Sequence, residues 1–267
     1  MSATYEVYAI KYARHDRPAG DNFIGGDPHN GPMPLDYYIW AIVGAGRTLV
    51  VDTGFSPESG LRRGRRTVNP PAEGLKALGI EPGRVQDVII THMHYDHAGN
   101  HELFPEAAYH LQDREMSYCT GRCMCHGMLR DAYEPADVAR MVHRVFEGRA
   151  RFHDGDSEVA PGITVHLVGG HTNGLQVVRV RTRRGWVVLA SDASHLYANM
   201  EQGRPFPIVN NVADMFEGFE TVHRLAESAS HVIPGHDPEV LRRFPAAGEA
   251  LSGWVARLDA DPVARGA

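Results

Sequence analysis

Several absences narrow the function before any motif is considered. The sequence has only 3 cysteines among its 267 residues, all in one short segment, so we expect no disulfide framework and a reducing, cytoplasmic location. Its apolar runs all fall short of the roughly 18 residues that suggest a membrane-spanning helix, so no transmembrane helix is expected. The first residues lack the charged start, apolar run and small-residue cleavage site of a signal peptide.

Positive charge is also scarce. The formal net charge is -6, and the one basic cluster, Leu61 to Arg66 (LRRGRR), is short. Such a cluster is more typical of a solvated loop than of a polyanion site. We therefore expect a small-molecule partner, with no nucleic acid and no membrane, and a monomer or homodimer.

The order of predicted elements favours an α/β fold with two sheets. The apolar, β-branched runs that predict strands are Tyr5–Tyr12, Tyr37–Val43, Thr48–Val51, Val88–Thr91, Ala108–Leu111, Thr164–Val168, Gln176–Val180, Val187–Ala190 and His231–Ile233. Helices are predicted at Ala72–Leu78, near Asn100–Phe104 and at Ala213–Ser228. Two strand-rich runs that each lead into helices suit two packed sheets with helices outside.

Residues 113–148 are mostly helical but polar, and we interpret them as a helical insertion or cap near an active site. They contain Cys119, Cys123, Cys125 and His126, whose C-x3-C-x-C-H spacing matches no common zinc module. A separate metal site, a soft lining of the substrate mouth and plain packing of the cap are the alternatives for this segment.

Histidine, by contrast, is abundant, with 16 residues in the chain. Neutral imidazole is the commonest protein metal ligand. Six residues, His92 to His97 (HMHYDH), follow an apolar run. Alternate side chains of an extended chain point the same way, so His92, His94 and Asp96 would share a side, and His97 would join on the next turn. Burying these groups without a cation would cost several kcal/mol.

Further metal ligands are expected later in the chain, because six residues cannot complete two sites. His171, Asp192 and His236 each follow an apolar run that ends in a polar residue, and sheets of α/β proteins build their sites at strand ends. The resulting set of nitrogen and oxygen ligands without a thiolate suits zinc and tolerates iron, manganese or cobalt.

These motifs together resemble the metallo-β-lactamase superfamily, and most closely its N-acyl-homoserine lactonases. HMHYDH looks like the HxHxDH signature, and the later ligands resemble the family's later motifs, from Val51-Asp52-Thr53-Gly54 to Gly235-His236. The resemblance covers nearly the whole chain. It implies one metallo-β-lactamase-like domain over residues 1–267, an αββα sandwich in which two mixed sheets pack face to face with helices outside.

The resemblance also implies two Zn²⁺ ions per chain. The ligands would divide as His92, His94 and His171 for one zinc, Asp96, His97 and His236 for the other, and Asp192 as the bridge. Asp52 resembles a residue that orients a ligand histidine, although an Asp before Thr-Gly is equally typical of a turn.

The implied activity is the opening of a lactone ring. Two metals can share a hydroxide that attacks the carbonyl carbon, after which Asp96 or Asp192 would pass a proton to the leaving alkoxide. Lactonases of this group often carry a Tyr three residues after the bridging Asp, aimed at the substrate carbonyl. This chain has His195 there, so His195 or Tyr197 would donate that hydrogen bond. A second departure is Gly169-Gly170-His171, where relatives commonly read Pro-Gly-His.

Other activities of the same fold remain as alternatives: a thioesterase like glyoxalase II, a β-lactamase, a phosphodiesterase and an iron oxygenase. A bridging Asp192 disfavours the β-lactamase, His94 in place of the usual Glu disfavours redox chemistry, and the lack of a basic stripe disfavours a nuclease. Outside enzymes, the alternative is a metal-stabilised sensor of a small ligand.

Overall fold

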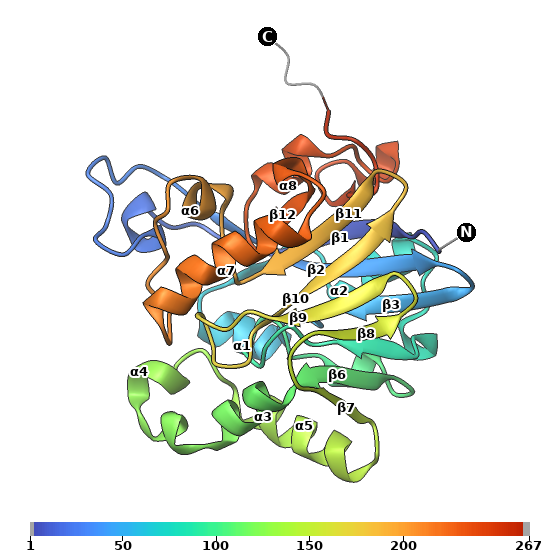
Figure 1. Cartoon of the computed structure of the whole chain (residues 1–267), viewed down its shortest axis with the longest axis horizontal. Coiled ribbons are helices and arrows are strands. Elements are labelled where there is room, and N and C mark those ends of the chain that lie inside the picture. Colours follow the sequence, from blue (N-terminus) through green and yellow to red (C-terminus); the bar gives the residue numbers. More distant parts are fainter. Residues whose placement is uncertain (1–2, 264–267) are drawn as a thin grey trace.

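The structure, a computed structural model, describes residues 3–263 and contains two sheets (Figure 1). The first sheet has the strand order β13 (Val255–Arg257), β1 (Glu6–His15), β2 (Leu35–Gly44), β3 (Arg47–Val51), β5 (Asp87–Ile89), β6 (Ala108–Gln112) and β7 (Ala150–His153), with β4 (Arg66–Thr67) paired to β1. The second has the order β12 (Val232–Pro234), β11 (Gly185–Ser191), β10 (Gln176–Thr182), β9 (Ile163–Leu167) and β8 (Ser157–Ala160). Both sheets mix parallel and antiparallel pairs.

Helices cover the outer sides of the sheets. They are α1 (Pro57–Arg62), α2 (Pro71–Ala77), α3 (Asp113–Thr120), α4 (Gly127–Arg130), α5 (Pro135–Phe146), α6 (Tyr197–Glu201), α7 (Val212–Leu225) and α8 (Glu239–Arg243). Short 3₁₀ helices lie at Ala19–Asn22, Pro82–Arg84, His101–Leu103, Arg122–Cys125, Ala229–His231 and Glu249–Leu251. In Figure 1, α7 lies along the second sheet, and α3, α4 and α5 gather at the lower edge of the view. No helix among residues 3–263 is long and apolar enough to cross a membrane.

The layers follow from strands that bury both faces. Along β2, Ile39 and Ala41 belong to the core on the outer side of the first sheet, whereas Trp40 and Ile42 belong to the core between the sheets. Successive strand side chains point to opposite faces, so a continuous apolar run can fill two cores at once. A third core joins the second sheet to Val222 and Leu225 of α7, and these cores confirm the αββα sandwich.

Most predicted elements are present with shifted ends. The first strand continues past Tyr12 to His15 because its polar end pairs with β2 and β4, which apolarity alone does not signal. The helix predicted near Asn100–Phe104 is only a 3₁₀ turn at His101–Leu103. The short strands β4, β7 and β8 were missed because few of their side chains are buried or apolar enough to mark them. The strand β13 was missed because it spans only three residues, although two of them are buried.

Candidate metal centre

The candidate ligands come from strand ends that meet at one edge of the two sheets. The HMHYDH segment follows β5, Asp192 follows β11 and His236 follows β12. Extended geometry holds only as far as His94, because the backbone N–H groups of His97 and Ala98 donate to the His94 carbonyl, at 3.0 and 3.1 Å, and close a turn. The expectation that Asp96 would share a side with His92 and His94 is therefore wrong.

The side chains form two neighbouring groups. In each group the ligand atoms lie within 4.8 Å of one another, and the groups are His92, His94 and His171, and Asp96, His97 and His236. Two further sets that meet the same distance both contain Asp192, one with His92 and His97 and the other with His171 and His195. Asp192 faces both of them. Its Oδ2 is 3.3 Å from His171 Nε2, and its Oδ1 is 3.0 Å from His236 Nε2. The structure thus brings all seven predicted ligands together and points one oxygen of Asp192 at each group.

The imidazoles are oriented by partners behind them. His97 Nδ1 donates to Asp52 Oδ2 at 2.7 Å, His171 Nδ1 to the Ile208 carbonyl at 2.6 Å, and His236 Nδ1 to the Asp36 carbonyl at 3.0 Å. With the proton fixed on Nδ1, the Nε2 lone pair of each ring faces the centre, as metal-binding histidines are held.

Asp52 is buried, and it also accepts hydrogen bonds from Thr91 N and Oγ1 at 2.7 and 2.8 Å. Its backbone lies in the left-handed region, with φ 60°. Asp52 therefore combines the two readings that its sequence context left open, a turn residue and a residue that orients His97.

The donor set fits a metal ion. His171 Nε2 lies 2.9 Å from His94 Nδ1 and 3.2 Å from His92 Nε2, and nitrogens bound tetrahedrally to one zinc would be about 3.3 Å apart. In the second group, His97 Nε2 is buried without a hydrogen-bond partner, as is Asp192 Oδ1. Buried polar atoms rarely stay unpaired, and a cation between the groups would satisfy both.

The pKa shifts of the histidines also differ between the two groups. Burial, reinforced by neighbouring imidazoles, lowers the pKa of His92 and of His94 well below the usual value. Burial also acts to lower the pKa of His97, but the carboxylates of Asp192, Asp96 and Asp52 outweigh it and raise that pKa well above the usual value. The pKa of His236 is raised through Asp192 and Asp96 in spite of burial. His92 and His94 are thus neutral ligands, while at His97 and His236 a cation would replace protons.

His195 and Tyr197 lie in different surroundings. His195 Nε2 is 3.0 Å from Asp192 Oδ2, and the ring stacks on Phe206 with centroids 3.4 Å apart. Burial lowers the pKa of His195 to about 3, despite the attraction of Asp192. Tyr197 packs in the core between the sheets, under the guanidinium of Arg243 at 3.6 Å, so its ring points away from the metal ligands.

The Gly169-Gly170 pair is explained by backbone conformation. Gly169 has φ 73° and Gly170 has φ 81°, and a proline, whose φ is fixed near about -65°, cannot adopt the first of these. A Cβ on Gly170 would also lie 2.7 Å from the Met215 backbone nitrogen. The loop that presents His171 therefore follows a course that requires glycine at Gly169.

Sequence reasoning missed Glu115, a buried carboxylate that ties the ligand loops to α3. It accepts hydrogen bonds from Met93 N at 2.9 Å, Thr172 Oγ1 at 2.6 Å, Gly174 N at 3.1 Å and Tyr133 Oη at 3.1 Å. Met93 lies between two ligand histidines, and Thr172 follows another. The only sequence signal is an acidic residue in an otherwise ordinary helical turn, so its partners could not be foreseen.

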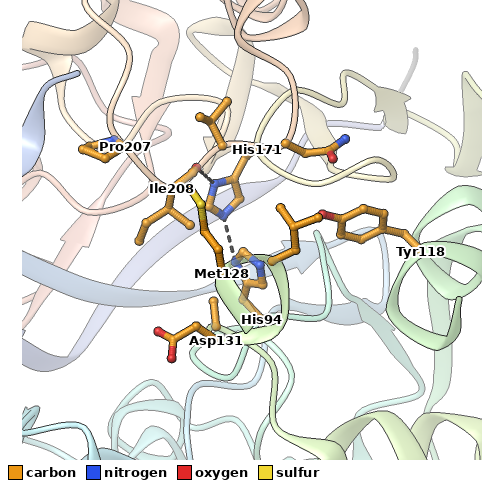
Figure 2. A pocket seen from close by; sticks show the side chains of 11 residues that line it. His94, Tyr118, Met128, Asp131, His171, Pro207 and Ile208 are labelled. Carbon is orange, nitrogen blue, oxygen red and sulfur yellow. Dashed lines mark hydrogen bonds between the residues drawn. The ribbon is translucent and has the colours of Figure 1, made fainter. Parts of the chain in front are cut away.

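Two adjoining cavities open onto the ligand cluster. One, of about 180 Å³, is walled by apolar side chains that include Tyr118, Met128 and Ile208, and Figure 2 shows these around the contact between His94 and His171. The other, a chamber of about 70 Å³, is lined by the ligands together with polar and charged side chains. Both cavities include His94 and His171 in their walls.

The cysteines take no part in the centre. Cys119 is buried, Cys123 is half-buried and Cys125 is exposed. Within the described part of the chain, none of the side-chain clusters that suit a metal contains a cysteine or His126. Tyr118 and Met128, from the same segment, are the residues that reach the apolar cavity.

Comparisons with known proteins agree with this geometry. The family model described as the metallo-beta-lactamase superfamily matches residues 33–247. The chain is 28% identical over 174 residues to an N-acyl homoserine lactonase of Bacillus cereus, a match covering 59% of this chain and 64% of that protein. It is 26% identical over 229 residues to the N-acyl homoserine lactonase AiiB of Agrobacterium fabrum strain C58, covering 78% of this chain and 80% of that one.

A solved quorum-quenching N-acyl homoserine lactone lactonase has the same fold. It aligns with a TM-score of 0.73 and 22% identity, over 89% of this chain and 93% of that chain. At that identity the likeness concerns the fold alone. The Bacillus match spans just under two thirds of its relative's length.

Proposed function

Since the chain belongs to the metallo-β-lactamase superfamily, we propose that it is a zinc-dependent hydrolase that opens the ring of an N-acyl-homoserine lactone or a related small lactone. The observation that carries the proposal is the pair of ligand groups with Asp192 between them. Similarity to two N-acyl homoserine lactonases supports the choice of a lactone. Two zinc ions per chain match the two groups, because nitrogen and oxygen donors without thiolate suit zinc.

The bound metals would supply an activated hydroxide and a Lewis acid at neutral pH. The protein's own groups do the rest. Asp96 and Asp192 are the carboxylates beside the reacting atoms, and either can hold the proton that the leaving ring oxygen needs. In the net reaction water adds to the acyl carbon, the acyl–oxygen bond breaks and the ring oxygen leaves as a hydroxyl.

In this proposal His195 acts through its contact with Asp192. With its lowered pKa the ring is neutral at physiological pH, so it can donate one N–H, and Asp192 Oδ2 lies at 3.0 Å from Nε2. We therefore assign His195 to the positioning of Asp192, with Phe206 fixing the plane of its ring. The apolar cavity around Tyr118, Met128 and Ile208 would hold the substrate's apolar part.

The test is lactone opening followed by proton release, with metal content counted on the same sample. We expect about two metals per chain and turnover of homoserine lactones or simple butyrolactones, both reduced by His94→Ala. Two metals without turnover of any lactone would contradict the lactonase and direct the search to thioesters and phosphodiesters. One metal or none would contradict the ligand assignment.

A further inference from the structure

The chamber above the ligand cluster has a cationic wall that metal binding does not explain. Its lining includes Arg17, Arg63 and Arg65, with the hydroxyl-bearing rings of Tyr37 and Tyr95 beside them. Arginine stays protonated at every physiological pH. A site that only had to hold a neutral lactone would have no need of fixed positive charges that are drawn from two separate loops.

One of the three guanidinium groups is paired with a carboxylate of the protein. Arg63 Nε donates to Glu134 Oε1 at 3.1 Å, its Nη2 donates to the Asp131 carbonyl at 2.6 Å, and its guanidinium lies over the Tyr95 ring at 4.3 Å. Its charge is compensated by Glu134, so Arg63 shapes the wall without offering an unpaired charge to a ligand.

The other two lack an acidic partner. Arg65 donates only to neutral groups, through Nε to Tyr95 Oη at 3.0 Å and through Nη1 to the Arg63 carbonyl at 2.8 Å, with His15 Nε2 at 3.1 Å. Arg17 donates through Nη2 to the Asp21 carbonyl, while its Nε is buried without a partner.

Neither Arg17 nor Arg65 forms a salt bridge with any carboxylate of residues 3–263. Asp21 acts on Arg17 from farther away, and Asp96 acts likewise on Arg65. A metal ion bound by Asp96 would take up that charge. Neither guanidinium therefore has a carboxylate in direct contact, at a partly buried place where an anion would be held strongly.

We propose that Arg17 and Arg65 form a subsite for a carboxylate that the substrate carries in addition to the lactone. This inference rests on the proposed function and narrows it to lactones that bear a free carboxylate. Guanidinium groups match the two oxygens of a carboxylate, and a chamber of about 70 Å³ suits a small planar anion. The adjoining apolar cavity of about 180 Å³ takes the rest of the molecule.

The reaction on such a substrate yields a hydroxy-dicarboxylate. Water adds to the lactone carbonyl, the acyl–oxygen bond breaks, and the ring oxygen takes a proton and becomes a hydroxyl. The new carboxylate forms at the ligand cluster, while the carboxylate already present stays on Arg17 and Arg65. Substrate and product are thus both anchored at the cationic wall.

A matched pair of lactones tests the subsite. 5-Oxotetrahydrofuran-2-carboxylate and its carboxamide differ only in the charged group. For the zinc-loaded protein we expect kcat/KM to be about tenfold to a hundredfold higher for the carboxylate. This factor corresponds to the free energy that a hydrogen bond to a charged group contributes. Arg65→Gln and Arg17→Gln should each remove this preference, by lowering kcat/KM much more for the carboxylate than for the carboxamide. Arg66→Gln, an exposed neighbour in the same loop, is the matched control.

Equal rates on the two lactones, or variants that slow both equally, would overturn the subsite. Because Arg65 also holds Tyr95, Arg17→Gln serves as the second variant should Arg65→Gln not fold.

Binding separates failure of the subsite from failure of the proposed function. By calorimetry with the zinc-loaded protein, 2-hydroxyglutarate should bind about tenfold or more tightly than 4-hydroxybutyrate, which lacks the second carboxylate. Arg65→Gln should abolish the difference. If this holds while no lactone is opened, the proposed function fails and the subsite stands. Equal binding of the two hydroxy acids overturns the subsite. If inorganic phosphate displaces 2-hydroxyglutarate more effectively than acetate does, the proposal that the subsite binds a carboxylate is overturned.

Discussion

The ligand cluster and the cationic wall share one chamber but are built in opposite ways. In the cluster, each of His97, His171 and His236 has its rear nitrogen bonded to a fixed acceptor, so the face toward the centre is set in advance. In the wall, Arg17 and Arg65 donate hydrogen bonds only to neutral groups, and Arg17 Nε has no hydrogen-bond partner. The difference shows where the protein itself determines what binds, and where the substrate must complete the interaction.

Breaking the support of the cluster should have the largest effect. Glu115→Ala leaves four buried donors without their acceptor, three of them on the loops that carry His94 and His171. We expect the free energy of unfolding to fall by about 3–5 kcal/mol. Urea denaturation of the metal-free protein measures it, with the exposed Glu102→Ala as control. A loss no greater than that of the control would mean that other contacts hold these loops.

Asp52→Asn tests whether the cluster and the wall act independently. The amide keeps the shape but weakens the acceptor behind His97, so zinc affinity should fall about 10- to 100-fold. At saturating zinc the preference for the carboxylated lactone should remain. Arg65→Gln should show the reverse, with zinc affinity kept and the preference lost. Competition with a chelator measures the zinc affinity, and the kinetics of the lactone pair measure the preference for the carboxylate. A variant that changes both quantities would contradict the independence of the cluster and the wall.

The two regions should also respond differently to pH. Without metal, nearby carboxylates raise the pKa values of His97 and His236, so these rings hold protons that zinc must displace. Zinc affinity should therefore fall as the pH falls from about 8 to about 6.5, by up to about tenfold per pH unit for each displaced proton. Arginines do not titrate in this range, so the carboxylate preference should stay level. Chelator competition over this range checks the first part, and zinc affinity independent of pH would refute it.

The fold and the ligand cluster could be predicted because their signals are local. Most of the longer strands are buried apolar runs, and His171, Asp192 and His236 each follow the end of one within four residues. The grouping of Asp96 could not be derived from strand geometry, because a turn closed on the His94 carbonyl reverses the chain there. Asp36, which orients His236 through its carbonyl, lies 200 positions away in the sequence, and no pattern connects such a pair.

The cationic wall shows what local patterns miss. The interpretation of Leu61 to Arg66 as a solvated loop holds for Arg62 and Arg66, which are exposed, but is wrong for Arg63 and Arg65, which line the chamber. Their direction is set by contacts with distant residues, such as the bond from Arg63 to the Asp131 carbonyl, 68 positions away, and the bond from Arg65 to Tyr95 Oη, 30 positions away. Charge composition cannot distinguish the arginines that face solvent from those that face a site.

The smallest effect is expected from Arg63→Gln, which sharpens the comparison within the wall. Arg63 lines the same chamber as Arg65, but its charge is already paired with Glu134, and its Nη2 donates to the Asp131 carbonyl. Glu134 would keep its bonds from Ser59 and Arg62. Removing Arg63 should therefore cost about 0.5–1.5 kcal/mol of stability and leave the preference for the carboxylated lactone within about twofold. Denaturation and the kinetics of the lactone pair measure these values. A loss of preference as large as that of Arg65→Gln would show that the wall acts through its summed charge, because the pairing of Arg63 with Glu134 would then make no difference.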